Sequence, residues 1–105
     1  MKNFEDSRNL CKTMGSKLVK IEDEKELNFI QNQVSYFTWI GLSRKGIQST
    51  WTWEDNSLPF HKMSIEWKGL KAGKCASLAA KQIAPSDCSR LMHSICAKKI
   101  NSMAT

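Results

Sequence analysis

The chain lacks the short motifs that mark the common classes of enzyme. Its 105 residues contain no Gly-x-Ser-x-Gly, no His-Glu-x-x-His and no phosphate-binding glycine loop. Its two histidines, His61 and His93, stand in separate segments, so the sequence offers no set of nucleophile, base and orienting group. These absences argue against catalysis and favour a role in binding.

Cysteines in a Cys-x-x-Cys pattern are also absent, which argues against a zinc ribbon or a thioredoxin-like site. The four cysteines are Cys11, Cys75, Cys88 and Cys96. A domain of this length buries only about 60–65% of its unfolded surface, so its core alone is a marginal source of stability. We therefore expect two disulfides, in one of three possible pairings, and an oxidising extracellular compartment. The alternative is a cytosolic domain with four reduced, buried cysteines.

Long apolar runs are missing too. No stretch of about 18 apolar residues occurs, and the first residues do not have the charged-then-apolar layout of a secretion signal. An extracellular protein needs a route out of the cell. We therefore interpret Met1 as the start of a fragment whose export or anchoring segment lies upstream.

Acidic residues are fewer than basic ones. The chain has 16 Lys and Arg against 10 Asp and Glu, for a formal net charge of +6. The basic residues are spread over the whole chain rather than gathered in one block. This pattern is typical of a solvated basic surface and not of a nucleic-acid-binding stripe, so we expect no nucleic-acid partner.

Helical signals come first along the chain. Residues 3–14 have apolar side chains at helical spacing, with Asn3 in position to cap the start and Gly15 where a helix commonly ends. Residues 23–26, Asp-Glu-Lys-Glu, form a second capping pattern, and Leu27, Ile30 and Val34 then predict one apolar side of a second helix. The stretch 16–21 between them predicts a short strand or an extended link.

Strand signals follow. Residues 39–43 and 51–55 are short runs rich in aromatic and β-branched residues, and the glycine-containing stretch 44–48 predicts a tight loop between them. Trp51 and Trp53 share one strand face at period two, so we expect them, like Trp39, to pack in the core.

The second half mixes strands with loops. Residues 75–79 and 93–97 have the length and composition of strands, whereas 56–74 and 83–90, each with a proline, predict surface loops. We expect one domain over residues 1–100 and a disordered tail over 101–105.

The order of these parts resembles the C-type lectin-like domain. A helix with a cysteine, a second helix, Trp-Ile-Gly-Leu, Trp-x-Trp-Glu-Asp, a loop and three cysteines ending in Ser-Ile-Cys-Ala-Lys-Lys follow one another from Phe4 to Lys99. Within that superfamily, residues 15–21 and 26–31 look like the lectin-like receptors of natural killer and myeloid cells. The resemblance implies an α+β fold, with two helices packed on small antiparallel sheets and a long loop region.

The resemblance also implies a strand upstream of the first helix, which this chain starts too late to include. The strand that pairs with the chain's end is then unaccounted for. For the cysteines, the resemblance implies the pairing Cys11–Cys96 and Cys75–Cys88. The first bridge would tie the first helix to the last strand, and the second would clamp the loop-bearing region.

Calcium is the point at which the chain departs from the sugar-binding members of the superfamily. Those members carry Glu-Pro-Asn or Gln-Pro-Asp in the long loop and Trp-Asn-Asp before the third cysteine. Here Pro59 lies between two apolar residues, and Ala-Pro-Ser-Asp precedes Cys88. Because Ca²⁺ takes about six to eight oxygen ligands, Glu66 and Asp87 alone would make too poor a site. We expect no metal, no cofactor and no calcium-dependent monosaccharide binding.

A surface that recognises another macromolecule is then the expected site. Six loop residues combine aromatic, aliphatic and basic side chains, the mixture that supplies buried anchors and a polar rim. They are Trp67, Lys68, Leu70, Lys71, Lys81 and Ile83. Trp67 has an equally good interpretation as a cover for the core, and an individual loop lysine is more often simply solvated.

By the same resemblance, the chain is expected to be the extracellular domain of a type II membrane receptor, commonly a homodimer or heterodimer. Its partner would be a cell-surface protein, class I-like or lectin-like, bound without calcium. The alternative is a calcium-independent scavenger or pattern receptor for polyanions, oxidised lipoprotein or β-glucan. Binding of a polyanion should fall steeply with salt, whereas an interface anchored by Trp67 and Leu70 should depend on salt less.

Overall fold

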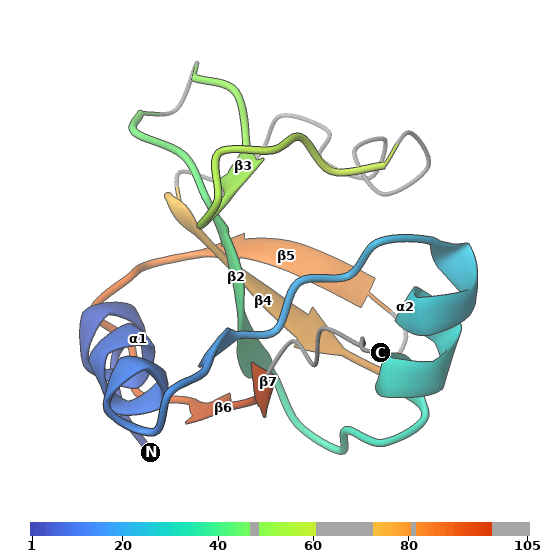
Figure 1. Cartoon of the computed structure of the whole chain (residues 1–105), viewed down its shortest axis with the longest axis horizontal. Coiled ribbons are helices and arrows are strands. Elements are labelled where there is room, and N and C mark those ends of the chain that lie inside the picture. The colour runs from blue at the N-terminus through green and yellow to red at the C-terminus, as the bar shows by residue number, and fades with distance from the viewer. Residues whose placement is uncertain (47–48, 61–72, 81, 98–105) are drawn as a thin grey trace.

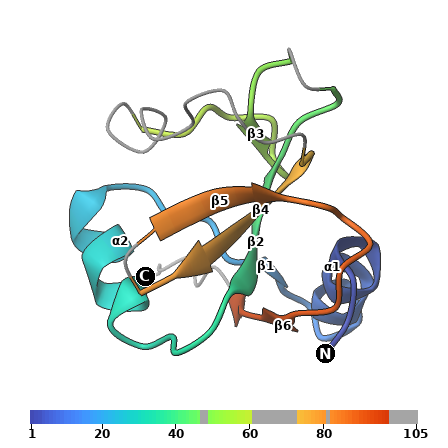
Figure 2. The same cartoon turned by 180° about the vertical axis from the view of Figure 1, so that it is seen from behind.

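The computed structural model describes residues 1–46, 49–60, 73–80 and 82–97. In both views of the molecule, two helices lie at opposite ends of a sheet (Figures 1 and 2). The first elements are α1 (Phe4–Thr13), β1 (Lys17–Leu18), α2 (Glu24–Gln31), β2 (Thr38–Ser43) and β3 (Thr52–Trp53). The later ones are β4 (Cys75–Ala79), β5 (Gln82–Ser86), β6 (His93–Ser94) and β7 (Cys96–Ala97).

Helix α1 starts and ends where the sequence predicts. The side-chain oxygen of Asn3 accepts a hydrogen bond from the Asp6 backbone N–H at 2.8 Å, which satisfies one of the unpaired donors of the first turn. The helix stops before Gly15, whose φ of 72° is readily reached only without a side chain. Its inner face buries Phe4, Ser7 and Cys11.

Helix α2 is capped in a similar way. Asp23 accepts from the Glu26 backbone N–H at 2.8 Å, and the Glu26 carboxylate accepts from the N–H of Glu22 at 2.7 Å. The helix ends at Gln31, so Val34 lies beyond it, contrary to the prediction from apolar spacing. No residue of α2 is fully buried.

Strand β2 lies at the centre of the sheet. Within the described residues, the strand order is β3-β2-β4-β5, and the short β6 pairs with β2 in parallel. Strands β1 and β7 form a separate antiparallel pair, in which Leu18 lies opposite Cys96. The last described strand therefore has its partner in β1, a pairing that sequence analysis left open.

The stretch 83–90 was predicted to be a loop, and for its first residues that prediction is wrong. Strand β5 pairs with β4, with Pro85 opposite Ala76. Among the described strands β5 is at the sheet edge, where the missing N–H of proline is tolerated. Strand β3 is shorter than predicted, and the predicted strand 93–97 is divided at Ile95. Most of the predicted 56–74 loop and the predicted tail lie outside the described residues.

Buried side chains gather in two clusters around β2. One cluster comprises Val19, Ile21, Ile40, Leu42, Trp51, Trp53, Ala76, Leu78 and Ile83. The other comprises Phe4, Cys11, Leu18, Trp39, Cys75 and Met92. The edge of Phe4 meets Trp39 with their ring centres 5.5 Å apart, and the Trp39 indole N–H donates to the Lys2 carbonyl at 3.0 Å. The prediction that Trp39, Trp51 and Trp53 pack in the core is confirmed.

Both implied disulfides are present. Cys11–Cys96 joins α1 to β7 across 85 positions of sequence, and Cys75–Cys88 joins β4 to the turn after β5 across 13. None of the four cysteines is free. The long bridge thus fixes the first helix to the last described strand, as expected.

Candidate recognition groove

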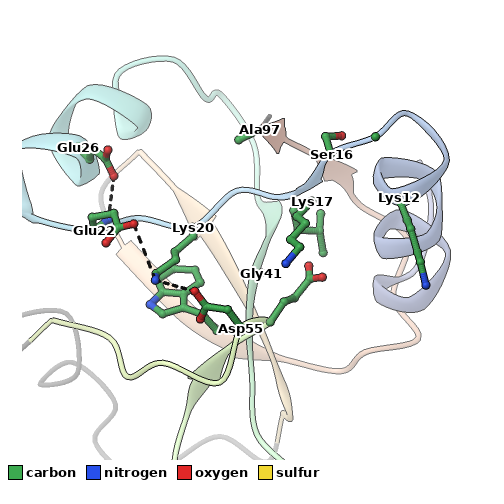
Figure 3. A pocket seen from close by; sticks show the side chains of 13 residues that line it. Lys12, Ser16, Lys17, Lys20, Glu22, Glu26, Gly41, Asp55 and Ala97 are labelled. Carbon is green, nitrogen blue, oxygen red and sulfur yellow. Dashed lines mark hydrogen bonds and ion pairs between the residues drawn. The ribbon is translucent and has the colours of Figure 1, made fainter. Parts of the chain in front are cut away.

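A groove of about 680 Å³ lies between the α1–β1 segment and the end of β3 (Figure 3). Its floor includes Leu18, Gly41 and Trp53, all buried. The Gly41 backbone N–H donates to the Val19 carbonyl at 3.0 Å. A Cβ at position 41 would lie only 3.0 Å from the Leu18 carbonyl oxygen, so the close approach of β2 to this segment needs a glycine.

One end of the groove is basic. Lys12 comes from the last turn of α1 and Lys17 from β1, and both are exposed. Figure 3 shows both side chains on the α1 side of the groove. Neither ammonium group makes a hydrogen bond or an ion pair within 4.0 Å to any residue that the structure describes.

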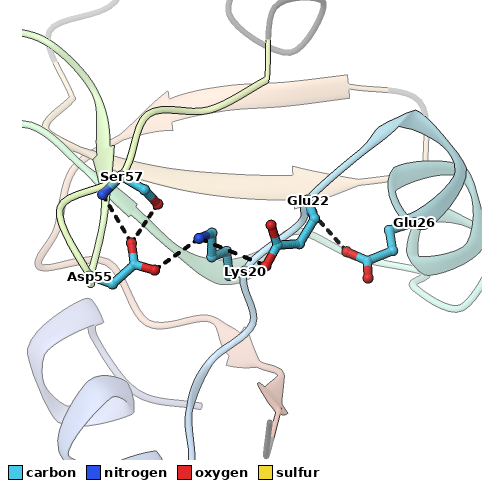
Figure 4. Close-up of polar contacts among 5 residues, drawn as sticks. All are labelled: Lys20, Glu22, Glu26, Asp55 and Ser57. Carbon is cyan, nitrogen blue, oxygen red and sulfur yellow. Dashed lines mark hydrogen bonds and ion pairs between the residues drawn. The ribbon is translucent and has the colours of Figure 1, made fainter. Parts of the chain in front are cut away.

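The other end carries a chain of polar contacts (Figure 4). The Lys20 ammonium pairs with Asp55 at 2.8 Å and lies 3.8 Å from a Glu22 carboxylate oxygen. The hydrogen bond from Lys20 and those from the Ser57 hydroxyl and N–H hold the pKa of Asp55 far below its ordinary value. The same contact with Asp55 raises the pKa of Lys20. At this end one lysine meets three carboxylates, so it carries a net negative charge, and Asp55, Glu22 and Glu26 all make polar contacts within the chain.

Glu54 differs from its neighbour Asp55. Its Oε2 atom is buried and has no hydrogen-bond partner, and a Cβ at position 41 would lie 3.3 Å from it. Burial raises the pKa of Glu54, an effect that the positive charges of Arg8 and Lys17 partly offset. Glu54 Oε2 is therefore a buried acceptor, closed off beside Gly41, that the described protein atoms leave unsatisfied.

Five of the six predicted contact residues lie outside the described residues: Trp67, Lys68, Leu70, Lys71 and Lys81. The sixth, Ile83, is on β5 with 7% of its surface exposed and packs in the core. Its burial leaves little side chain for a partner to contact. The groove was not predicted from the sequence. The one signal was the adjacent pair Glu54-Asp55 at the end of an apolar strand, where we expected only strand.

No metal centre is evident in the part of the chain that the structure describes. There, no three His, Cys, Asp or Glu side chains come close enough to hold an ion. Asp87 accepts hydrogen bonds from the Ser89 N–H at 2.9 Å and from its hydroxyl at 2.8 Å, and these lower its pKa. Asp87 thus closes a turn. Over the same residues, neither helix has the length and hydrophobicity needed to cross a bilayer.

Comparison with known families shows to which protein family the chain belongs. The profile of the Lectin C-type domain family matches residues 1–98. The chain belongs to this family. Domains of this lectin-like receptor group recognise ligands and do not catalyse reactions, which agrees with the missing catalytic motifs.

Individual relatives place this C-type lectin domain more narrowly. It is 37% identical to killer cell lectin-like receptor 6 of Mus musculus, over 87% of this chain and 35% of the relative. It is 32% identical to oxidized low-density lipoprotein receptor 1 of Oryctolagus cuniculus, over 94% of this chain and 39% of the relative. The chain thus spans well under half the length of these curated relatives.

Solved structures agree with that placement. The crystal structure of natural killer cell receptor Ly49C superposes with a TM-score of 0.84 at 31% identity, covering 99% of this chain and 83% of that one. The expected C-type lectin fold and the resemblance to killer cell lectin-like receptors are therefore confirmed.

Proposed function

We propose that this C-type lectin domain is the extracellular recognition domain of a type II membrane receptor that binds a cell-surface protein without calcium. The observation that carries the proposal is the similarity to killer cell lectin-like receptor 6 along most of the chain. The partner would be a class I-like or lectin-like protein. The membrane anchor would lie upstream of Met1, and the receptor would act as a homodimer or heterodimer.

Independence from calcium has two supports. The sequence carries neither tripeptide of the sugar-binding members, and Pro59 is flanked by apolar residues. Asp87, the carboxylate next to Cys88, is already bonded to Ser89. A calcium ion would have to break those bonds and find most of its oxygen ligands elsewhere.

The test is binding of the multimerised domain to a panel of cells, with calcium or with EGTA. We expect staining that EGTA does not change and that protease treatment of the cells removes. Trp67→Ala should lower the affinity at least about tenfold at an unchanged melting temperature. Tyr36→Ala serves as the control, because Tyr36 is also an exposed aromatic residue and lies outside the proposed contact loops.

Two results would contradict this proposal. One is staining that requires calcium, accompanied by a large rise in melting temperature when calcium is added. The other is staining that survives protease but not removal of glycans or lipids. Unchanged binding by the Trp67→Ala variant at unchanged stability would remove Trp67 alone from the contact surface.

A second function has its own support. The similarity to oxidized low-density lipoprotein receptor 1 and the net charge of +6 favour a scavenger or pattern receptor for polyanions, oxidised lipoprotein or β-glucan. A salt titration separates the two proposals, because binding to a polyanion falls steeply between low and physiological salt. A protein interface with apolar anchors should weaken much less.

A further inference from the structure

A buried carboxylate oxygen without a donor lies where three strands meet. Glu54 directly follows β3, and its Oε2 atom lies beside Gly41 of β2, close to the end of β1. We propose that Glu54 is a proton switch: acidification from neutral pH protonates its carboxyl group and strengthens the junction of β3 with β1 and β2. The inference goes beyond the proposed function, because it concerns the fold and holds for any partner.

Carbonyl oxygens lie near Glu54 Oε2, but no described donor reaches it. A Cβ at position 41 would lie 3.3 Å from this oxygen, 3.0 Å from the Leu18 carbonyl oxygen and 3.3 Å from that of Val19. The Gly41 N–H donates to the Val19 carbonyl at 3.0 Å, and Oε2 has no hydrogen-bond partner among the described protein atoms. Three oxygens therefore face one small space at the glycine.

Such surroundings favour the neutral form of the side chain. A charged carboxylate oxygen that is buried without a donor has lost its hydration and has gained no bond in exchange. The protonated group carries no charge, and its O–H can donate. A backbone carbonyl has two lone pairs, so a neighbouring one can accept that O–H even when it already accepts another bond.

Helix α1 supplies one positive and one negative charge near this site. Arg8 lowers the pKa of Glu54, and Glu5 raises it. The two are bonded to each other, because Nη2 of Arg8 donates to the Glu5 carboxylate oxygens at 2.9 and 2.8 Å. Each partner weakens the field of the other, so α1 provides only part of a counter-charge.

The remaining neighbours add one cation. Lys17 of β1 lowers the pKa of Glu54, but its side chain is exposed and its charge is screened by solvent. Strand β2 has no ionisable side chain, and Asp55, the next residue along, is paired with Lys20 at 2.8 Å. Burial outweighs these charges, so the pKa of Glu54 is raised above its ordinary value of 4.5.

The raised pKa gives the direction of the pH effect. Between the ordinary pKa and the folded one, the folded chain holds a proton on Glu54 that the unfolded chain releases, so stability rises as the pH falls through this interval. Asp55 acts in the opposite sense, but only below its ordinary pKa of 3.8. The two effects therefore occupy separate pH ranges, and that of Glu54 lies nearer to neutral pH.

This direction matters for a receptor that is taken up into the cell. A domain that passes from the cell surface into a compartment at about pH 5–6 becomes more stable at the β3 junction and keeps its fold there. This consequence rests on the proposed function, whereas the proton switch does not.

The experiment compares the melting temperatures of the full chain and its Glu54→Gln variant between about pH 7.5 and about pH 4.5. Glutamine has nearly the shape of the protonated carboxyl group and carries no charge, so the variant should melt higher at the neutral end. This difference should shrink by at least about 3 °C toward the acidic end. Histidine side chains are the same in both proteins, so their titration cancels in the difference.

A matched control and a direct titration complete the test. Glu24→Gln removes the same charge from an exposed position on α2, and its difference from the unaltered chain should change by less than about 1 °C over the same range. NMR titration of the ¹³C carboxyl signal of Glu54 in the unaltered chain should give a midpoint above the ordinary value of 4.5. The amide signal of Gly41 should move with the same midpoint, because the two groups are in contact.

Three results would overturn the inference: a Glu54 midpoint at or below 4.5, a melting-temperature difference for Glu54→Gln that does not change with pH, or an equal change for Glu24→Gln. None of these measurements uses a partner, so the two proposals fail separately. Absence of protease-sensitive cell staining would remove the proposed function and leave the proton switch in place. Loss of the pH effect would remove the switch and leave the proposed function in place.

Discussion

Helices α1 and α2 begin in the same way but are held in different ways. Asn3 and Asp23 each accept a hydrogen bond of 2.8 Å from the backbone three residues on. Helix α1 then buries three side chains and carries one end of a disulfide, whereas α2 buries none. The comparison teaches that caps decide where a helix starts, while burial decides how hard it is to unfold.

The attachments of α2 are correspondingly light. Leu27 and Ile30 are only partly buried against the core, and the Gln31 side chain donates to the Ala79 carbonyl at 3.1 Å. The Lys20–Asp55 pair holds the segment that leads into the helix. We therefore expect α2 to open in local fluctuations that leave α1 intact.

The largest expected effect comes from the bridge that only α1 has. Replacing Cys11 and Cys96 together by Ala should lower the free energy of unfolding by about 4–5 kcal/mol, because the bridge closes a long loop. Urea unfolding followed by tryptophan fluorescence measures this. The paired control Cys75→Ala/Cys88→Ala should cost about 3 kcal/mol. A larger cost for the short bridge would contradict the expectation that the bridge closing the longer loop stabilises the fold more.

The next largest effect compares one apolar side chain from each helix. Phe4→Ala removes the edge contact with Trp39 and leaves a cavity, so it should cost about 3–5 kcal/mol. Leu27→Ala removes a side chain that is only partly buried and should cost about 1 kcal/mol. Thermal and urea unfolding of both variants give the values. Equal costs would show that α2 is packed as firmly as α1.

Removing the two caps should give smaller and unequal effects. Asn3→Ala and Asp23→Ala each delete one capping hydrogen bond, worth about 1 kcal/mol. In α1 that loss should appear in the global unfolding free energy. In α2 it should appear mainly as faster hydrogen exchange over residues 24–31. Exchange measured by NMR distinguishes these outcomes, and a matching drop in global stability for both variants would argue against local opening.

The smallest effect is that of acid on the segment before α2. The pKa of Asp55 is lowered in the folded protein, so its pairing stabilises the fold above its ordinary pKa near 3.8. That stabilisation is lost as the pH falls below this value toward the folded pKa. Because the pair is exposed, the change should be below about 1 kcal/mol. Asp55→Asn should remove it, and exchange in α2 should respond more than exchange in α1.

The parts of the fold that sequence analysis predicted are those with local causes. Asn3, Asp23 and Gly15 act on their own turns, so both helix starts and the end of α1 could be predicted from short stretches. The end of α2, which has no such local signal, was predicted too late. The strand at Pro85 could not, because it depends on its pairing with Ala76 in β4 and its place at the sheet edge. The disulfide pairing needed the family resemblance.

The groove could not be predicted from local sequence patterns for a similar reason. Lys12, Gly41 and Glu54 are far apart in the chain and meet only when β2 and β3 lie against the α1–β1 segment. The exposed Asp55 and the unsatisfied Glu54 are neighbours of the same chemical class in sequence. Their tertiary surroundings differ. Asp55 is bonded to Lys20 and Ser57, whereas Glu54 is packed beside Gly41.

The Cys11–Cys96 link has a consequence for biosynthesis. A ribosome adds about 5–20 residues per second, so the thiol of Cys11 waits about 4–17 seconds before its partner has even been made. During that interval Cys75 and Cys88 emerge in turn and compete for it. Correct oxidation therefore depends on those two pairing with each other first, and folding of this domain should need a disulfide isomerase whenever that order fails.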